Sequence, residues 1–188
     1  MSRNYPNHGK YEWLPILYDM VSVLKPKKII EFGPGSGYTT IAMAKALDEN
    51  KVDGRIKSYD IWDDKYWGSK TVTQAEYDAW SVSNYITLQQ LDFYEWIKNG
   101  CEEFDFLYFD INNTAEKIEI LYEAVKNQIE RGSVIFFEGG SKERDLHGHN
   151  GGGMYSIKDK IGYKILTGNV KYSASTIYNE KIYDLDFS

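Results

Sequence analysis

The stretch Lys28–Gly37, which reads K-I-I-E-F-G-P-G-S-G, decides the fold of this chain. A short apolar run leads into a turn with three glycines, and the segment that follows is rich in Ala and Ile. This order predicts a strand at 28–32, a tight turn and a helix. Glycine lets a backbone turn sharply and approach a ligand closely, and the first turn of a helix offers unpaired N–H groups. The stretch therefore predicts a ligand-binding turn, with a plain helix-entry turn as the alternative.

The same alternation of strand and helix continues along the chain. Apolar periodicity predicts further strands at 55–59, 85–91, 104–109, 134–137, 163–166 and 175–178, and helices at 11–24, 38–47, 71–80, 93–98 and 115–131. Strands that alternate with helices are typical of parallel sheets, whereas two strands without a helix between them favour an antiparallel pair. We therefore expect an α/β fold, with a Rossmann-like, seven-stranded, mostly parallel sheet, helices on both faces and an antiparallel terminal pair.

Composition limits the classes of protein to consider. The 188 residues suit one domain (1–188), with an N-terminal helix in 1–27 and the core in 28–188. The net charge of −6 argues against a nucleic-acid partner, because phosphate binding needs clustered Lys and Arg. No apolar run approaches the roughly 20 residues of a membrane span, and no secretory signal opens the chain. A single cysteine, Cys101, fits a reducing compartment, so we expect a cytoplasmic protein.

Acidic residues follow the second and third expected strands. Asp60 lies where nucleotide-binding folds place an acid that accepts the ribose hydroxyls, although a solvated turn aspartate is the alternative. Asp92 either accepts from an adenine amino group or caps the helix at 93–98. A dinucleotide-binding fingerprint requires glycine at the position that Tyr38 occupies. This difference disfavours an NAD-dependent oxidoreductase.

On these residues the chain resembles the class I S-adenosylmethionine-dependent methyltransferases, over about residues 11–178. The 31–37 stretch is similar to their first motif, and 104–110 and 132–138 resemble their fourth- and fifth-strand motifs. The resemblance implies S-adenosylmethionine as cofactor and S-adenosylhomocysteine as product. The cofactor-binding residues that it implies are Glu31, Gly33, Gly35, Gly37, Tyr38, Asp60, Ile61, Asp92, Phe93 and Asp110.

Within that class the chain is most similar to small O-methyltransferase-like proteins of the family-24 type. That group often carries Asp-Gly-Asp-His after strand four and Asp-Asp after strand five. Here residues 110–113 read D-I-N-N and residues 138–140 read E-G-G. A divalent cation bound by oxygen ligands needs several carboxylates, and only Asp110 and Glu138 remain. The sequence therefore argues against a metal site.

Three residues are candidates for catalysis. Glu138, at the end of the fifth strand, is placed to act as a base, or else it hydrogen-bonds the amides of the two glycines that follow. His147 and His149 lie in the loop 141–153 and either supply a base or belong to a mobile surface loop. The aromatic residues Trp62, Tyr66 and Trp67 either line a pocket or pack their own loop.

Methyl transfer to a small-molecule oxygen or nitrogen acceptor is the function that these features favour. The alternative is a protein that binds S-adenosylmethionine or S-adenosylhomocysteine without methyltransferase activity, since several motif acids are replaced. We expect a small-molecule substrate, no nucleic acid and no membrane as partners. We expect the exposed terminal strands to offer a homodimer contact.

Overall fold

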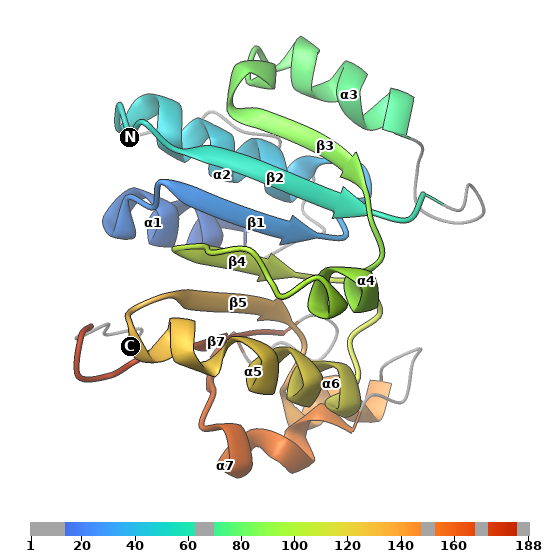
Figure 1. Cartoon of the computed structure of the whole chain (residues 1–188), viewed down its shortest axis with the longest axis vertical. Helices are drawn as coiled ribbons and strands as arrows, with labels where there is room; N and C mark the ends of the chain where they lie inside the picture. The colour runs from blue at the N-terminus through green and yellow to red at the C-terminus, as the bar shows by residue number, and fades with distance from the viewer. Residues whose placement is uncertain (1–13, 63–69, 148–152, 168–172, 184–188) are drawn as a thin grey trace. The chain divides into compact units, whose positions relative to one another are not determined.

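The structure is a computed structural model that describes residues 14–62, 70–147, 153–167 and 173–183 (Figure 1). The chain divides into two compact units, Met1–Trp96 and Ile97–Ser188. The expectation of a single domain over 1–188 stays a prediction.

The first unit holds three parallel strands in the order β3-β2-β1. Its elements are α1 (Leu14–Leu24), β1 (Lys28–Phe32), α2 (Tyr38–Glu49), β2 (Arg55–Asp60), α3 (Lys70–Ala79), the 3-10 helix η1 (Ser83–Tyr85) and β3 (Ile86–Gln90), and α4 (Phe93–Lys98) begins at its end. The register sets Phe32 beside Tyr59 and Asp60 beside Gln90. The carboxyl ends of the three strands therefore meet at one edge, where the arrowheads point in Figure 1.

An aromatic cluster fills the core of the first unit near that edge. The ring of Phe32 lies 5.3 Å from Tyr59, 5.8 Å from Phe93 and 5.2 Å from Trp96, measured between ring centroids. The contacts with Phe93 and Trp96 are edge-on, an arrangement that aromatic rings favour. The end of β1 is thus packed against the neighbouring strand and α4 just before the glycine turn.

The second unit combines a parallel and an antiparallel part, in the order β4-β5-β7-β6. Its elements are β4 (Phe106–Phe109), α5 (Ala115–Glu130), β5 (Val134–Glu138), α6 (Lys142–His147), the 3-10 helix η2 (Met154–Ile157), α7 (Lys158–Ile161), β6 (Lys164–Thr167) and β7 (Ala174–Ile177). β4 and β5 are parallel, and β7 runs antiparallel to both β5 and β6. β4 and β5 are buried along their whole length, as their continuous apolar runs predict.

The predicted fold class, a seven-stranded and mostly parallel sheet with an antiparallel terminal pair, is confirmed. The strand Lys28–Phe32 and the helix Phe93–Lys98 have the bounds that the sequence predicts, and most other elements differ by one or two residues at an end. One expectation is wrong: the segment 141–153 is not a loop throughout, because α6 occupies Lys142–His147. The side chain of Ser141 caps this helix by accepting from the Arg144 amide at 3.0 Å. A helix of six residues is too short to display an apolar period.

In the described part of the chain, no helix is long and apolar enough to cross a membrane.

Candidate functional site

The glycine turn follows β1 and enters α2. Gly33, Gly35 and Gly37 have φ values of +81°, +51° and +85°, which lie in the left-handed region that favours glycine. The Gly33 amide donates to the Tyr59 carbonyl at 2.9 Å, and the Gly37 amide donates to the Pro34 carbonyl at 2.7 Å. Gly37 is the N-cap of α2 and has no side chain to cap the helix, and Tyr38, which is partly exposed, is the first helical residue. The start of α2 can therefore offer N–H groups to a ligand.

Glu31 lies directly beneath this turn and has no exposed surface. Its carboxylate accepts from three hydroxyls, those of Thr39 at 2.6 Å, Thr40 at 2.5 Å and Ser58 at 2.6 Å. Burial raises the pKa of the Glu31 carboxyl, and the three hydrogen bonds act in the opposite direction. These bonds join β1, α2 and β2 beneath the turn.

Asp60 ends β2 at the same strand edge and is partly exposed. Its Oδ1 accepts from the Trp62 amide at 3.1 Å, and its carbonyl accepts from the Leu91 amide at 3.1 Å. The next residue, Ile61, is half exposed, and its carbonyl accepts from the Gln90 side chain at 2.8 Å. The carboxylate is thus held by its own turn while it stays open to solvent in part.

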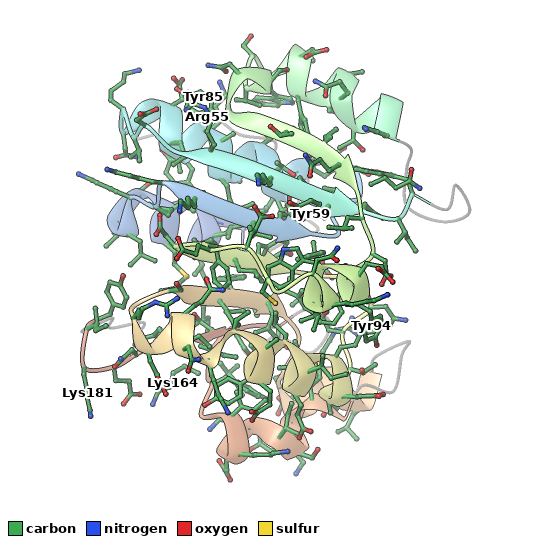
Figure 2. The ribbon with its side chains drawn as sticks, viewed as in Figure 1. Arg55, Tyr59, Tyr85, Tyr94, Lys164 and Lys181 are labelled. Carbon is green, nitrogen blue, oxygen red and sulfur yellow. The ribbon has the colours of Figure 1, made fainter. Side chains whose placement is uncertain are left out.

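Asp92 caps α4, since its Oδ1 accepts from the Tyr94 amide at 2.8 Å. The capping role that competed for Asp92 in the sequence is therefore present, and the carboxylate remains partly exposed. The side chain of Phe93 is 2 % exposed and packs on Phe32. Its ring therefore supports the strand edge from the core side. Its neighbour Tyr94 is 46 % exposed, lies on α4 in Figure 2 and has its ring centroid 5.1 Å from that of Phe93.

In the second unit, Asp110 and Asn113 follow β4. The Tyr108 hydroxyl donates to Asp110 Oδ2 at 3.2 Å, and Asp110 stays partly exposed. Asn113 is buried and its amide group donates to the carbonyls of Phe109 at 3.0 Å and Glu138 at 2.8 Å. Asn113 therefore ties together the carboxyl ends of β4 and β5. The described contacts of Asn113 therefore give it a structural role.

Glu138 ends β5 and pairs with Arg144 of α6. The Arg144 Nε donates to Glu138 Oε1 at 2.6 Å, and the two side chains are 20 % and 10 % exposed, respectively. Burial raises the pKa of the Glu138 carboxyl, and the Arg144 guanidinium opposes that rise by hydrogen bond and by charge. The arrangement keeps a nearly buried carboxylate beside a cation at the end of a strand.

The two glycines after Glu138 form backbone hydrogen bonds with other residues. The Gly139 amide donates to the Ser173 carbonyl at 2.6 Å, while the carbonyls of Gly139 and Gly140 accept from Ser175 and Tyr163 at 2.8 and 2.7 Å. The alternative in which Glu138 hydrogen-bonds both following amides is therefore wrong for Gly139. The Glu138 carboxylate accepts from the Arg144 guanidinium instead.

The donor set does not fit a divalent cation. Among the residues that the structure describes, no three His, Cys, Asp or Glu side chains gather as metal ligands, and the Arg144 guanidinium lies against Glu138. His147 ends α6, whereas His149, Tyr66 and Trp67 lie outside the described residues.

Sequence reasoning missed Arg144, Asn113, Thr73 and Tyr77. The cap at Ser141, with acids in the first turn of α6, was the available signal for the helix that carries Arg144. Thr73 and Tyr77 lie on α3, and Thr73 Oγ1 donates to the Gly35 carbonyl at 2.9 Å. A contact between residues this far apart has no local signal in the sequence.

A glycine turn after the first strand, with an acid at the end of the second, is an arrangement that nucleotide-binding α/β folds use. The model of a family described as "Methyltransferase domain" matches residues 30–138, more than half of the chain. The chain belongs to this methyltransferase-domain family. No curated protein sequence matches it.

Solved structures with the same fold are numerous. An O-methyltransferase from Bacillus cereus in complex with S-adenosylhomocysteine is 16% identical, with a TM-score of 0.69 over 94% of this chain and 85% of that one. The O-methyltransferase TomG from Streptomyces achromogenes, in complex with S-adenosylmethionine, is 15% identical, with a TM-score of 0.66 over 88% and 79%. The S-adenosylhomocysteine-bound methyltransferase PaMTH1 from Podospora anserina is 16% identical, with a TM-score of 0.63 over 88% and 76%. At these identities the likeness establishes the fold.

Proposed function

We propose that this protein transfers a methyl group from S-adenosylmethionine to an oxygen or nitrogen atom of a small molecule. The single observation that carries the proposal is the left-handed glycine turn between β1 and α2, in a chain of the methyltransferase-domain family. Two of the similar solved structures are O-methyltransferases, one with S-adenosylmethionine and one with S-adenosylhomocysteine, and a third is a methyltransferase with S-adenosylhomocysteine bound. Oxygen is therefore the first acceptor atom to test.

The first unit supplies the cofactor-binding residues in this proposal. Backbone groups of Gly33, Gly35 and Gly37 and the start of α2 receive the cofactor, while Asp60 accepts from the ribose hydroxyls. Ile61 and Tyr94 offer the exposed apolar surface that an adenine ring needs at the same strand edge. Glu31 contributes indirectly, because its hydroxyl-bound carboxylate holds the turn from beneath.

Glu138 is the proposed proton acceptor. When bound, S-adenosylmethionine supplies an electrophilic methyl group on a sulfonium, and an oxygen or nitrogen nucleophile must lose a proton as it reacts. Glu138 Oε1 accepts a hydrogen bond from Arg144, so the second carboxylate oxygen is the one that accepts the proton in this proposal. Arg144 favours the ionised form that this role needs.

A turnover assay tests the proposal. Purified full-length protein is incubated with S-adenosylmethionine and a panel of phenols, catechols, carboxylates and amines, and formation of S-adenosylhomocysteine is followed by mass spectrometry. Acceptor-dependent product supports methyl transfer and rules out the binding-only alternative. Tight binding of S-adenosylhomocysteine with no product from any acceptor would favour that alternative instead.

A further inference from the structure

Helix α3 reaches the glycine turn through two side chains on one face. Thr73 and Tyr77 are four residues apart, so they stand one above the other on the helix, and both are completely buried. Thr73 Oγ1 donates to the Gly35 carbonyl at 2.9 Å, although 38 residues separate them in sequence. The middle glycine of the turn is therefore fixed by a side chain from another element.

The ring of Tyr77 lies directly against the last glycine of the turn. A Cβ atom added at Gly37 would lie 2.6 Å from Tyr77 Cε1 and 3.3 Å from Thr73 Cγ2. The first distance is shorter than any ordinary contact, so a side chain at position 37 would displace α3 or the turn. Glycine is required at this position by the packing of α3 as well as by its φ of +85°.

A chain of hydroxyl groups then links Tyr77 to the carboxylate beneath the turn. The Tyr77 hydroxyl donates to Thr40 Oγ1 at 2.7 Å, and Thr40 Oγ1 donates to Glu31 Oε2 at 2.5 Å. An ionised carboxylate has no proton to give, so the direction of both bonds is fixed once Glu31 is ionised. Buried hydrogen bonds in series of this kind are mutually strengthening and specify one arrangement.

These contacts bear on ligand binding because a turn of three glycines is costly to order. Glycine has the largest backbone freedom of any residue, and a ligand that must freeze such a turn loses affinity to that cost. A scaffold that has already fixed the turn removes the cost from the binding step. We propose that Thr73 and Tyr77 are positioning residues for the cofactor, because they hold the glycine turn in its receiving conformation before the cofactor binds. This inference rests on the proposed function.

The test is calorimetric titration of the full chain with S-adenosylhomocysteine. Thr73→Val removes the hydroxyl and keeps the branched shape, Thr73→Ser keeps the hydroxyl, and Tyr77→Phe removes only the phenolic oxygen. Tyr85→Phe is the matched control. The Tyr85 hydroxyl donates to Asp48 Oδ1 at a distance of 2.8 Å, and neither residue belongs to the glycine turn. We expect Thr73→Val and Tyr77→Phe to bind about threefold to tenfold more weakly than wild type, as the loss of one hydrogen bond predicts. Thr73→Ser and Tyr85→Phe should bind within about twofold of wild type.

The possible results distinguish a failure of the positioning role from a failure of the proposed function. Wild-type protein that binds S-adenosylhomocysteine, with Thr73→Val binding equally well, overturns the inference and leaves the proposed function standing. Equal weakening in Tyr85→Phe also overturns it, because the effect would then be a general loss of stability. Wild-type protein that does not bind the ligand overturns the proposed function and the inference with it. If Tyr77→Phe does not fold, the Thr73 pair of variants decides the question alone.

Discussion

Removing the cation beside Glu138 is the perturbation that the structure predicts in most detail. Arg144→Gln keeps a long polar side chain in α6 but takes away the guanidinium that donates to Glu138 Oε1 at 2.6 Å. The carboxylate, whose side chain is 10 % exposed, would then stand almost buried without its cation. A buried charge that loses its partner carries the full cost of its removal from water.

The size of the effect follows from burial. Removal of one partner from a fully buried ion pair costs about 3–5 kcal/mol, and the Arg144 side chain is 20 % exposed, so water offsets part of that cost. We therefore expect Arg144→Gln to lower the free energy of unfolding at pH 7.5 by about 2 kcal/mol. For a chain of this length, that corresponds to a fall of roughly 4–8 °C in the unfolding midpoint.

The pH dependence gives the sign of the effect. Burial already raises the pKa of Glu138 above its ordinary value of 4.5, and without Arg144 the folded-state pKa rises further. An acid that binds its proton more tightly in the folded state loses stability as pH rises from the unfolded-state pKa toward the folded one. The deficit of Arg144→Gln should therefore be small near pH 4 and grow as pH increases above about 4.5.

Urea unfolding at pH 4 and pH 7.5 measures the free energy of unfolding of four proteins: wild type, Arg144→Gln, Glu138→Gln and the double variant. The double-mutant cycle should give a coupling energy of about 2 kcal/mol at pH 7.5. Lys126→Gln is the control, because its pair with Glu123 is exposed on α5, and no measurable change is expected. A coupling energy under about 0.5 kcal/mol, or a deficit that does not grow with pH, would refute the reasoning.

Three further variants test other parts of the account. Asp60→Ala should weaken S-adenosylhomocysteine binding about 10- to 150-fold in calorimetry, since a bond to a charged group contributes about 1.5–3 kcal/mol, while exposed Asp53→Ala should bind as wild type does. Unchanged affinity would remove Asp60 from the site. Gly140→Ala should cost about 2–4 kcal/mol in urea unfolding, because its Cβ would lie 2.5 Å from Ser175 Oγ at a φ of +99°, and a stability equal to wild type would contradict that contact. Glu138→Gln should bind S-adenosylhomocysteine within about twofold of wild type but turn over at least about tenfold more slowly, and equal turnover would end the assignment of Glu138 as base.

The sequence predicts the parts of this fold and site that depend on local order. The glycine turn, Asp60 and Glu138 each follow an apolar strand directly, and within the first unit the parallel strands bring the turn and Asp60 to one edge. The position of such residues at strand ends is therefore fixed as soon as the strands are recognised. The same logic predicts the antiparallel β6–β7 pair, since the sequence between the two strands shows no helical pattern.

Contacts between distant elements leave no comparable signal. Whether Glu31 faces a ligand or a set of hydroxyls depends on Ser58, which lies on another strand. The partner of Glu138 sits on a helix too short to show a period, and Thr73 meets Gly35 only because α3 packs on the turn. These are consequences of tertiary packing, which one-dimensional periodicity does not contain.

The measurement that tests the central claim most directly is thermal unfolding of the wild-type protein with S-adenosylmethionine, S-adenosylhomocysteine, NAD or no ligand. A ligand at 100 times its dissociation constant stabilises the native state by about 2.7 kcal/mol, which for a chain of this length is roughly 5–10 °C. The account predicts that both sulfur nucleosides raise the unfolding midpoint by this amount and that NAD does not. A rise with NAD alone, or no rise with any of the three, would contradict it.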